Sequence, residues 1–141
     1  MGMYTEFFFR AQLAKDAPAE VVDYLQHALT DRNWATLTAF DDHEFFQCRR
    51  WDTLLLGGSS LEFPTAGYSK FLADEGYSGN RIIIHASLKN YDGEALKFVD
   101  WISPYLSAAP GDFLGYTLYE DTKCNYDDQE SSLMIFMGGD E

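Results

Sequence analysis

The chain has 141 residues, of which 46% are hydrophobic and 16% aromatic, and its formal net charge is −13. These values predict one globular domain over residues 1–141 and argue against a disordered chain. They also argue against direct nucleic-acid binding, since a field of that sign repels phosphate backbones, and against a membrane protein, since no apolar run approaches the ~20 residues of a span.

The first half of the chain opens with EFFFRAQL at residues 6–13. Its period of two predicts a strand with two distinct faces. A helix should follow, because Pro18 suits a first helical turn and apolar residues recur at helical spacing over 21–29. Further strands are predicted at 44–56, 60–63 and 68–73.

The second half opens with RIIIHASL at residues 81–88, which predicts another two-faced strand. Asp92 suits the N-cap of the next helix, whose apolar stripe covers 98–106. Pro104 should end or kink this helix about one turn earlier than the first helix. The last strands are predicted at 112–120 and 131–137.

The two halves match in the same order along the chain. The matching pairs are 6–13 with 81–88, 21–29 with 98–106, 59–61 with 131–133 and, more weakly, 45–51 with 113–119. We therefore predict an α+β fold of two tandem βαββ repeats, about 1–73 and 80–137. The repeats should share one mainly antiparallel sheet with both helices on one face, as in a ferredoxin-like sandwich with pseudo-twofold symmetry.

Alternation in the strands divides their side chains between two faces. If the helices cover the face of Phe7 and Ile82, the opposite face carries Phe8, Arg10, Ile83 and His85. The same reasoning in the neighbouring predicted strands adds Phe45, Arg49, Trp51, Phe113, Thr117 and Tyr119. An aromatic surface with a few cations is typical of an interface with a partner or a second copy. The alternative is that the connector at 34–40 covers this face.

Carboxylates gather in two places, at 41–44 (DDHE) and in the acidic stretch 120–130. Neither has a metal-ligand spacing, because consecutive residues cannot all face one ion and Lys123 interrupts an EF-hand pattern that also lacks its glycine. We expect no metal, no cofactor and no catalytic residue here. The carboxylates expected to bind a partner with a basic surface are Asp41, Asp42, Glu44, Asp121, Asp127, Asp128 and Glu130.

Four stretches of the sequence carry a resemblance. They are 88–94 with 97–106, 111–116, 119–121 and the opening 3–6. Together they cover about half the chain and resemble a group of small uncharacterised proteins of bacteriophages and prophages. The resemblance implies a phage accessory protein in the host cytoplasm and no known activity. A cytoplasmic location also fits Cys48 and Cys124, which lie far apart behind no secretion signal.

Three hypotheses follow for function. The first is a non-enzymatic protein that binds a host protein, in a specific version an inhibitor of a nucleic-acid-binding defence complex whose carboxylates replace phosphates. The second is a self-associating scaffold that uses the aromatic sheet face as a twofold interface. The third is a small-ligand binder or enzyme with a pocket between the repeats, lined by Arg10, His85 and Tyr119.

Overall fold

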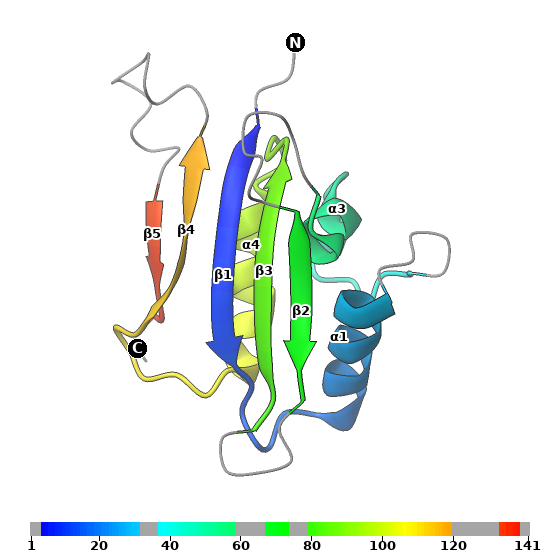
Figure 1. Cartoon of the computed structure of the whole chain (residues 1–141), viewed down its shortest axis with the longest axis vertical. Coiled ribbons are helices and arrows are strands. Elements are labelled where there is room, and N and C mark those ends of the chain that lie inside the picture. Colours follow the sequence, from blue (N-terminus) through cyan, green and yellow to red (C-terminus); the bar gives the residue numbers. More distant parts are fainter. Residues whose placement is uncertain (1–3, 32–36, 59–66, 74–78, 120–132, 139–141) are drawn as a thin grey trace.

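The structure is a computed structural model that describes residues 4–31, 37–58, 67–73, 79–119 and 133–138. These residues form an α+β fold with one antiparallel sheet of five strands in the order β2-β3-β1-β4-β5 (Figure 1). The strands are β1 (Thr5–Gln12), β2 (Tyr68–Leu72), β3 (Arg81–Leu88), β4 (Phe113–Tyr119) and β5 (Leu133–Phe136). The predicted α+β class and mainly antiparallel sheet are confirmed.

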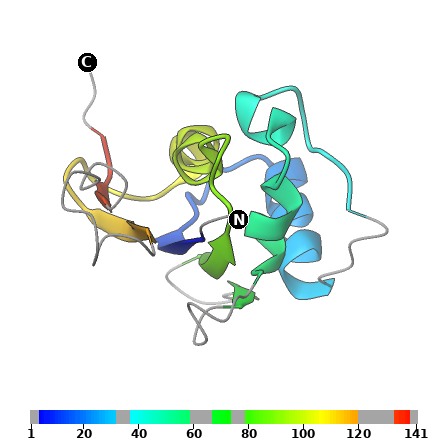
Figure 2. The ribbon, with the colours of Figure 1, turned by 90° about the horizontal axis from the view of Figure 1, so that it is seen from above.

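The helices pack on one side of this sheet, as the view from above makes plain (Figure 2). The longer ones are α1 (Ala19–Asp31) and α4 (Glu94–Ile102), and the shorter ones are α2 (Glu44–Gln47) and α3 (Trp51–Leu56). A 3₁₀ turn, η1 (Ser103–Tyr105), follows α4 directly. The α-helix thus ends just before Pro104, as predicted, because proline cannot donate the next helical hydrogen bond.

The central pair of strands sets the register of the sheet. Strands β1 and β3 pair over their full length, from Thr5 opposite Leu88 to Gln12 opposite Arg81. Residues that lie opposite each other share a face. Phe7 and Phe9 therefore point to the helices together with the even-numbered residues of β3, and they are fully buried.

Aromatic rings fill the layer between the sheet and the helices. Phe98 of α4 stands edge-on to Phe9 at 5.2 Å between ring centroids, to Phe45 at 5.3 Å and to Phe7 at 6.0 Å. Trp101, one turn further along α4, stacks on Phe45 at 6.2 Å. Burying each such side chain contributes about 1.5–3 kcal/mol, so this cluster holds α4 and α2 against β1.

The predicted strand at 44–56 is wrong, because this segment forms α2 and α3. The side chain of His43 caps α2 by accepting a hydrogen bond from the Phe45 backbone N–H at 3.0 Å. Trp51, Leu54 and Leu55 follow at helical spacing and place one face of α3 against the core. The strand predicted at 60–63 lies outside the described residues.

The start of α4 also differs from the prediction. Its N-cap is Gly93, whose φ of 75° suits glycine, and Asp92 instead accepts a hydrogen bond from the Arg49 backbone N–H at 2.9 Å. Glu94 is fully buried in the first turn and accepts from the backbone N–H groups of Asp92 and Arg50. These bonds tie the entry of α4 to the link between α2 and α3.

Strand β4 contains a register shift between Phe113 and Gly115 where it pairs with β5. Phe113 lies beside Arg10, on the face away from the helices, whereas Thr117 lies opposite Phe7 and faces the helices. The alternation is therefore reversed within β4, as an extra residue in a bulge requires. At Gly115 the backbones of β4 and β1 approach closely.

We expect Gly115→Ala to destabilise the fold by about 3 kcal/mol, at the upper end of overpacking costs. A Cβ at this position would lie 2.8 Å from the carbonyl carbon of Phe8 and 2.9 Å from the Cα of Phe9, so backbone would have to move. Urea unfolding measures the loss. Gly138→Ala is the control, since nothing lies within 4 Å of its added Cβ. Equal stability of the two variants would contradict the close approach.

Candidate functional site

The face of the sheet turned away from the helices is the candidate functional site, and we call it the open face (Figure 2). Within the described residues no helix packs on it. Strand register arranges its side chains in rows that run across the sheet. The aromatic row consists of Tyr68, His85, Phe8, Tyr116 and Met134. The cationic row consists of Lys70, Ile83, Arg10, Phe113 and Phe136.

The aromatic row packs continuously across four strands, β2, β3, β1 and β4, and Met134 of β5 lies opposite its last ring. Phe8 at its centre stacks on Tyr116 at 5.6 Å and stands edge-on to His85 at 5.5 Å. Tyr68 continues the row beyond His85 at 6.1 Å. The rings near the centre are half-buried by one another, whereas Tyr68 and Met134 at the two ends are exposed.

A polar group of three side chains borders the aromatic row. One carboxylate oxygen of Glu6 meets the Nε2 of His85 and also accepts a hydrogen bond from the Tyr116 hydroxyl at 3.1 Å. The side chains of Glu6 and His85 are only 9% and 14% exposed. Burial, then the negative charge of Glu6 and its hydrogen bond, raise the pKa of Tyr116 to about 12. Glu6 is thus already engaged by its own neighbours.

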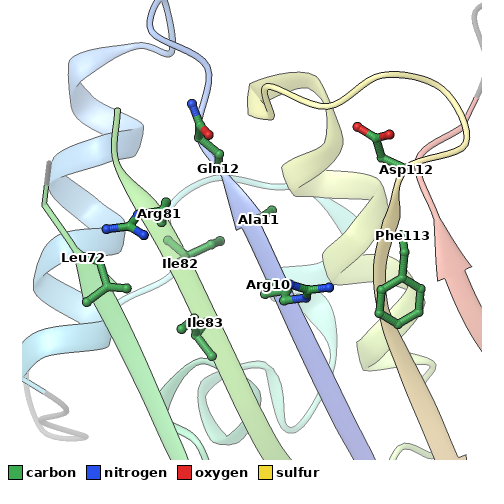
Figure 3. A pocket seen from close by; sticks show the side chains of 9 residues that line it. All are labelled: Arg10, Ala11, Gln12, Leu72, Arg81, Ile82, Ile83, Asp112 and Phe113. Carbon is green, nitrogen blue, oxygen red and sulfur yellow. The ribbon is translucent and has the colours of Figure 1, made fainter. Parts of the chain in front are cut away.

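The cationic row has a different chemistry. Arg10 lies over the ring of Phe113 at 5.8 Å, and Phe113 in turn meets Phe136 at 5.9 Å. Next to this row Arg81, the first residue of β3, lies opposite Gln12, the last residue of β1. A hollow of about 480 Å³ lies here, and its lining includes Arg10, Gln12, Leu72, Arg81, Ile83, Asp112 and Phe113 (Figure 3).

The charge of the open face is opposite to that of the chain as a whole. Three of the ten basic residues of the sequence, Arg10, Lys70 and Arg81, lie on it. Among the described strand residues of this face, Glu6 is the one carboxylate, and it is paired with His85. The open face is therefore apolar and locally basic on a molecule of net charge −13.

The residues that the sequence analysis assigned to this face are only partly found there. Phe8, Arg10 and His85 do lie on the open face. Phe45 is fully buried beneath the helices, and Trp51 packs edge-on against Phe46 at 5.3 Å on the same side. Arg49 follows α2, where its backbone is bonded to Asp92.

Tyr119 is also misplaced by the sequence analysis. It lies opposite Thr5 on the helix-facing side, and Thr117 likewise lies opposite Phe7. The bulge in β4 reversed the alternation after Phe113, so a period of two counted from Phe113 selects the wrong residues. The pocket expected between Arg10, His85 and Tyr119 is consequently not formed by these three side chains.

The acidic residues at 41–44 lie on the helix-covered side. Asp41, Asp42 and Glu44 are exposed, and Asp41 accepts hydrogen bonds from the His43 backbone at 2.8 Å and from the Trp101 indole at 3.4 Å. The remaining expected partner-binding carboxylates, Asp121, Asp127, Asp128 and Glu130, lie outside the described residues. No group of three or more potential metal ligands occurs in the parts of the chain that the structure describes.

The connector was the alternative cover for the open face. Its described end, Phe40, packs against Tyr24 at 5.1 Å and Trp101 at 5.8 Å, both on the helix-covered side. That part of the connector therefore closes the hydrophobic core and does not cover the open face. Residues 32–36 lie outside the description.

Sequence reasoning missed several residues of the site. The open-face positions of Tyr116, Met134 and Phe136 result from the bulge in β4 and from the pairing of β5, and the sequence carries no separate signal for either. Lys70 and Arg81 were within reach, because the strands at 68–72 and 81–88 were predicted and alternation within them selects both residues. No helix in the described residues is both long and apolar enough to span a membrane.

We expect Glu6→Gln to lower the pKa of Tyr116 from about 12 part of the way towards its ordinary 10, because burial remains while the negative charge is lost. Ring shifts of Tyr116, assigned with Tyr116→Phe, follow the titration by NMR. In the wild type the raised pKa implies stability that is present below pH 10 and is lost as pH rises towards 12. Glu44→Gln, an exposed carboxylate elsewhere, should leave the titration unchanged; an unaltered Tyr116 in Glu6→Gln would contradict the network.

No protein-family model matches the chain, and no curated protein or solved structure matches it. What characterises the site is therefore its own chemistry: a row of aromatic side chains beside a row of cations, on a sheet face that the described helices leave open.

Proposed function

We propose that this protein is a small non-enzymatic accessory protein, of the bacteriophage type that its sequence resembles, and that it binds a protein partner through the open face. The observation that carries the proposal is the exposure of large apolar side chains there. Tyr68 is 42% exposed, Leu118 37%, Met134 66% and Phe136 51%. Side chains of this size gathered on one face mark an interaction surface.

The composition of the open face favours a protein over a nucleic acid as partner. Aromatic residues, methionine and arginine are enriched in protein interfaces, and each occurs here. A nucleic acid would stack its bases on exposed aromatic rings, but the central rings of this face pack against one another. The largest exposed apolar area is instead on Met134 and Phe136. The net charge of −13 also repels phosphate backbones.

The polar group of the open face supports binding rather than catalysis. Glu6 and His85 pair in the way that an orienting carboxylate and a general base pair in enzymes with a serine nucleophile. The serine opposite Glu6 on the same face is Ser87. Because Ser87 is only 1% exposed, a substrate cannot reach its hydroxyl. A cytoplasmic location remains part of this proposal.

We expect the paired change Met134→Ser and Phe136→Ser to abolish partner binding, because it removes the most exposed apolar area of the open face. The measurement is affinity capture from host lysate with mass spectrometry. Leu96→Ser, on the outer side of α4 and 48% exposed, is the matched control and should capture as the wild type does. If the paired variant captured the same proteins as the wild type, the open face would not be the docking surface.

Self-association through the same face is the alternative. Two copies of net charge −13 repel each other, which favours a different partner at low salt. Light scattering distinguishes the two: a monomer at micromolar concentration supports a foreign partner, whereas a dimer that dissociates in the paired variant supports a homodimer interface.

A second candidate uses the acidic side of the molecule. Asp42 and Glu44 are exposed beside Asp41, and Asp100, 74% exposed, lies next to them through its contact with His43 at 2.9 Å. Carboxylates grouped in this way suit a basic partner, including the nucleic-acid-binding surface of a defence complex.

We expect Asp42→Asn with Glu44→Gln to weaken capture of such a basic partner and to reduce its salt dependence. Neutralising Asp121, Asp127, Asp128 and Glu130 tests the rest of the predicted acidic set. Capture measured at low and high salt provides the comparison, with Asp16→Asn, an exposed carboxylate in the turn between β1 and α1, as the control. Capture that neither neutralisation alters would reject the acidic version.

We also propose that the chain arose by tandem duplication and has a pseudo-twofold ferredoxin-like core. A twofold rotation that exchanges β1 with β3 and β2 with β4 turns the order β2-β3-β1-β4 into β4-β1-β3-β2, which is the same order read from the other edge of the sheet. The sequence match of 6–13 with 81–88 makes Phe9 equivalent to Ile84, and these two residues lie directly opposite each other. A local axis between them accounts for both observations, although α2 and α3 of the first half have no counterpart among the described residues of the second half.

A further inference from the structure

The hollow on the open face lies where β1 and β2 end and where β3 and β4 begin (Figure 3). Its volume of about 480 Å³ lies within the range of small-ligand sites. Ile83 forms an apolar floor, with Leu72 and Phe113 on the two sides. Such a shape holds a group of several carbon atoms.

Two guanidinium groups flank this floor. Arg81 extends towards Leu72 and Arg10 extends over Phe113, with Ile83 between them (Figure 3). Within the described residues neither arginine has a carboxylate at ion-pair distance. Lys70 of β2 lies opposite Ile83 and adds a third positive charge nearby.

The one acidic residue lining the hollow is already engaged. The carboxylate of Asp112 accepts a hydrogen bond from the Ala109 backbone N–H at 2.9 Å and so closes its own turn. Within the described residues both arginines that line the hollow therefore lack a competing carboxylate at ion-pair distance, and an anion brought by a ligand can pair with them.

We infer that the hollow is a binding site for a carboxylate carried on an apolar body. The planar fork of an arginine matches the two oxygens of a carboxylate, and the apolar body covers Ile83. The carboxylate can belong to a small organic acid or to an acidic side chain of the docked partner, and for the second source the inference rests on the proposed function. Ligands with several negative charges are disfavoured by the net charge of −13.

The charge requirement is tested with four probes. Phenylacetate combines a carboxylate with an apolar body, phenylacetamide is its neutral isostere, and acetate and inorganic phosphate lack the apolar body. We expect phenylacetate to shift the NMR signals of the Ile83 methyl groups and the Arg10 side chain, with phenylacetamide at least about tenfold weaker, since hydrogen bonds to charged groups are the stronger ones. Acetate and phosphate should bind more weakly than phenylacetate.

Variants locate the binding. Arg10→Gln with Arg81→Gln should reduce phenylacetate affinity about tenfold or more, because it removes both charges while keeping an unbranched polar side chain at each position. Arg49→Gln on the helix-covered side is the control and should bind phenylacetate as the wild type does. Equal affinity for phenylacetate and phenylacetamide, or unchanged affinity in the double variant, would overturn the inference. Tighter binding of phosphate than of phenylacetate would overturn the ligand class.

The source of the carboxylate is read from a pair of capped peptides, Phe-Glu-Phe and Phe-Gln-Phe. Tighter binding of the glutamate peptide than of phenylacetate assigns the site to a partner's acidic side chain, and the reverse order assigns it to a small organic acid. Loss of partner capture in the variant at Met134 and Phe136 with normal phenylacetate binding supports both proposals. Normal capture in that variant with normal phenylacetate binding removes the docking surface and leaves the anion site.

Discussion

The pairing of β1 with β3 is the constraint on which the rest of the structure depends. With Phe9 opposite Ile84, Phe7 and Phe9 face the helices together with the even-numbered residues of β3, whereas Phe8, Arg10 and His85 face away. A slip of β1 by one residue would turn its side chains over and place Arg10 in the core, and the same slip of β3 would place His85 there. The core of Phe7, Phe9, Phe45 and Phe98 exists only in this register, and so does the open face.

Charge and apolar area are distributed unequally between the two sides of the molecule. The helix-covered side carries exposed carboxylates at 41–44 and at Asp100, whereas the open face carries Arg10, Lys70 and Arg81 among exposed apolar residues. The acidic side favours basic partners, and the open face favours apolar or anionic groups. The carboxylate of Glu6 also lies on the open face, but it is already bound to His85 and Tyr116.

The bulge in β4 is a small feature with a large effect on the site. It lets Phe113 lie beside Arg10 while Tyr116, an odd number of residues later, lies beside Phe8 on the same face. Without the bulge Thr117 and Tyr119 would replace Tyr116 and Leu118 on the open face. The bond between Tyr116 and Glu6 and the rise in the pKa of Tyr116 would then be lost.

Local pattern in the sequence determined the strands at 68–72, 81–88 and 113–119, the helix ending before Pro104, and the open-face positions of Phe8, Arg10 and His85. These follow from period, side-chain alternation and proline geometry, which act over a few residues. The tertiary structure decided that 44–56 forms helices, in which Phe45 packs on Phe98, Phe46 packs on Trp101 and Trp51 packs on Phe46. It also decided the bulge and the meeting of Arg10, Lys70 and Arg81, since register between strands far apart in the sequence is set by contacts that no local pattern encodes.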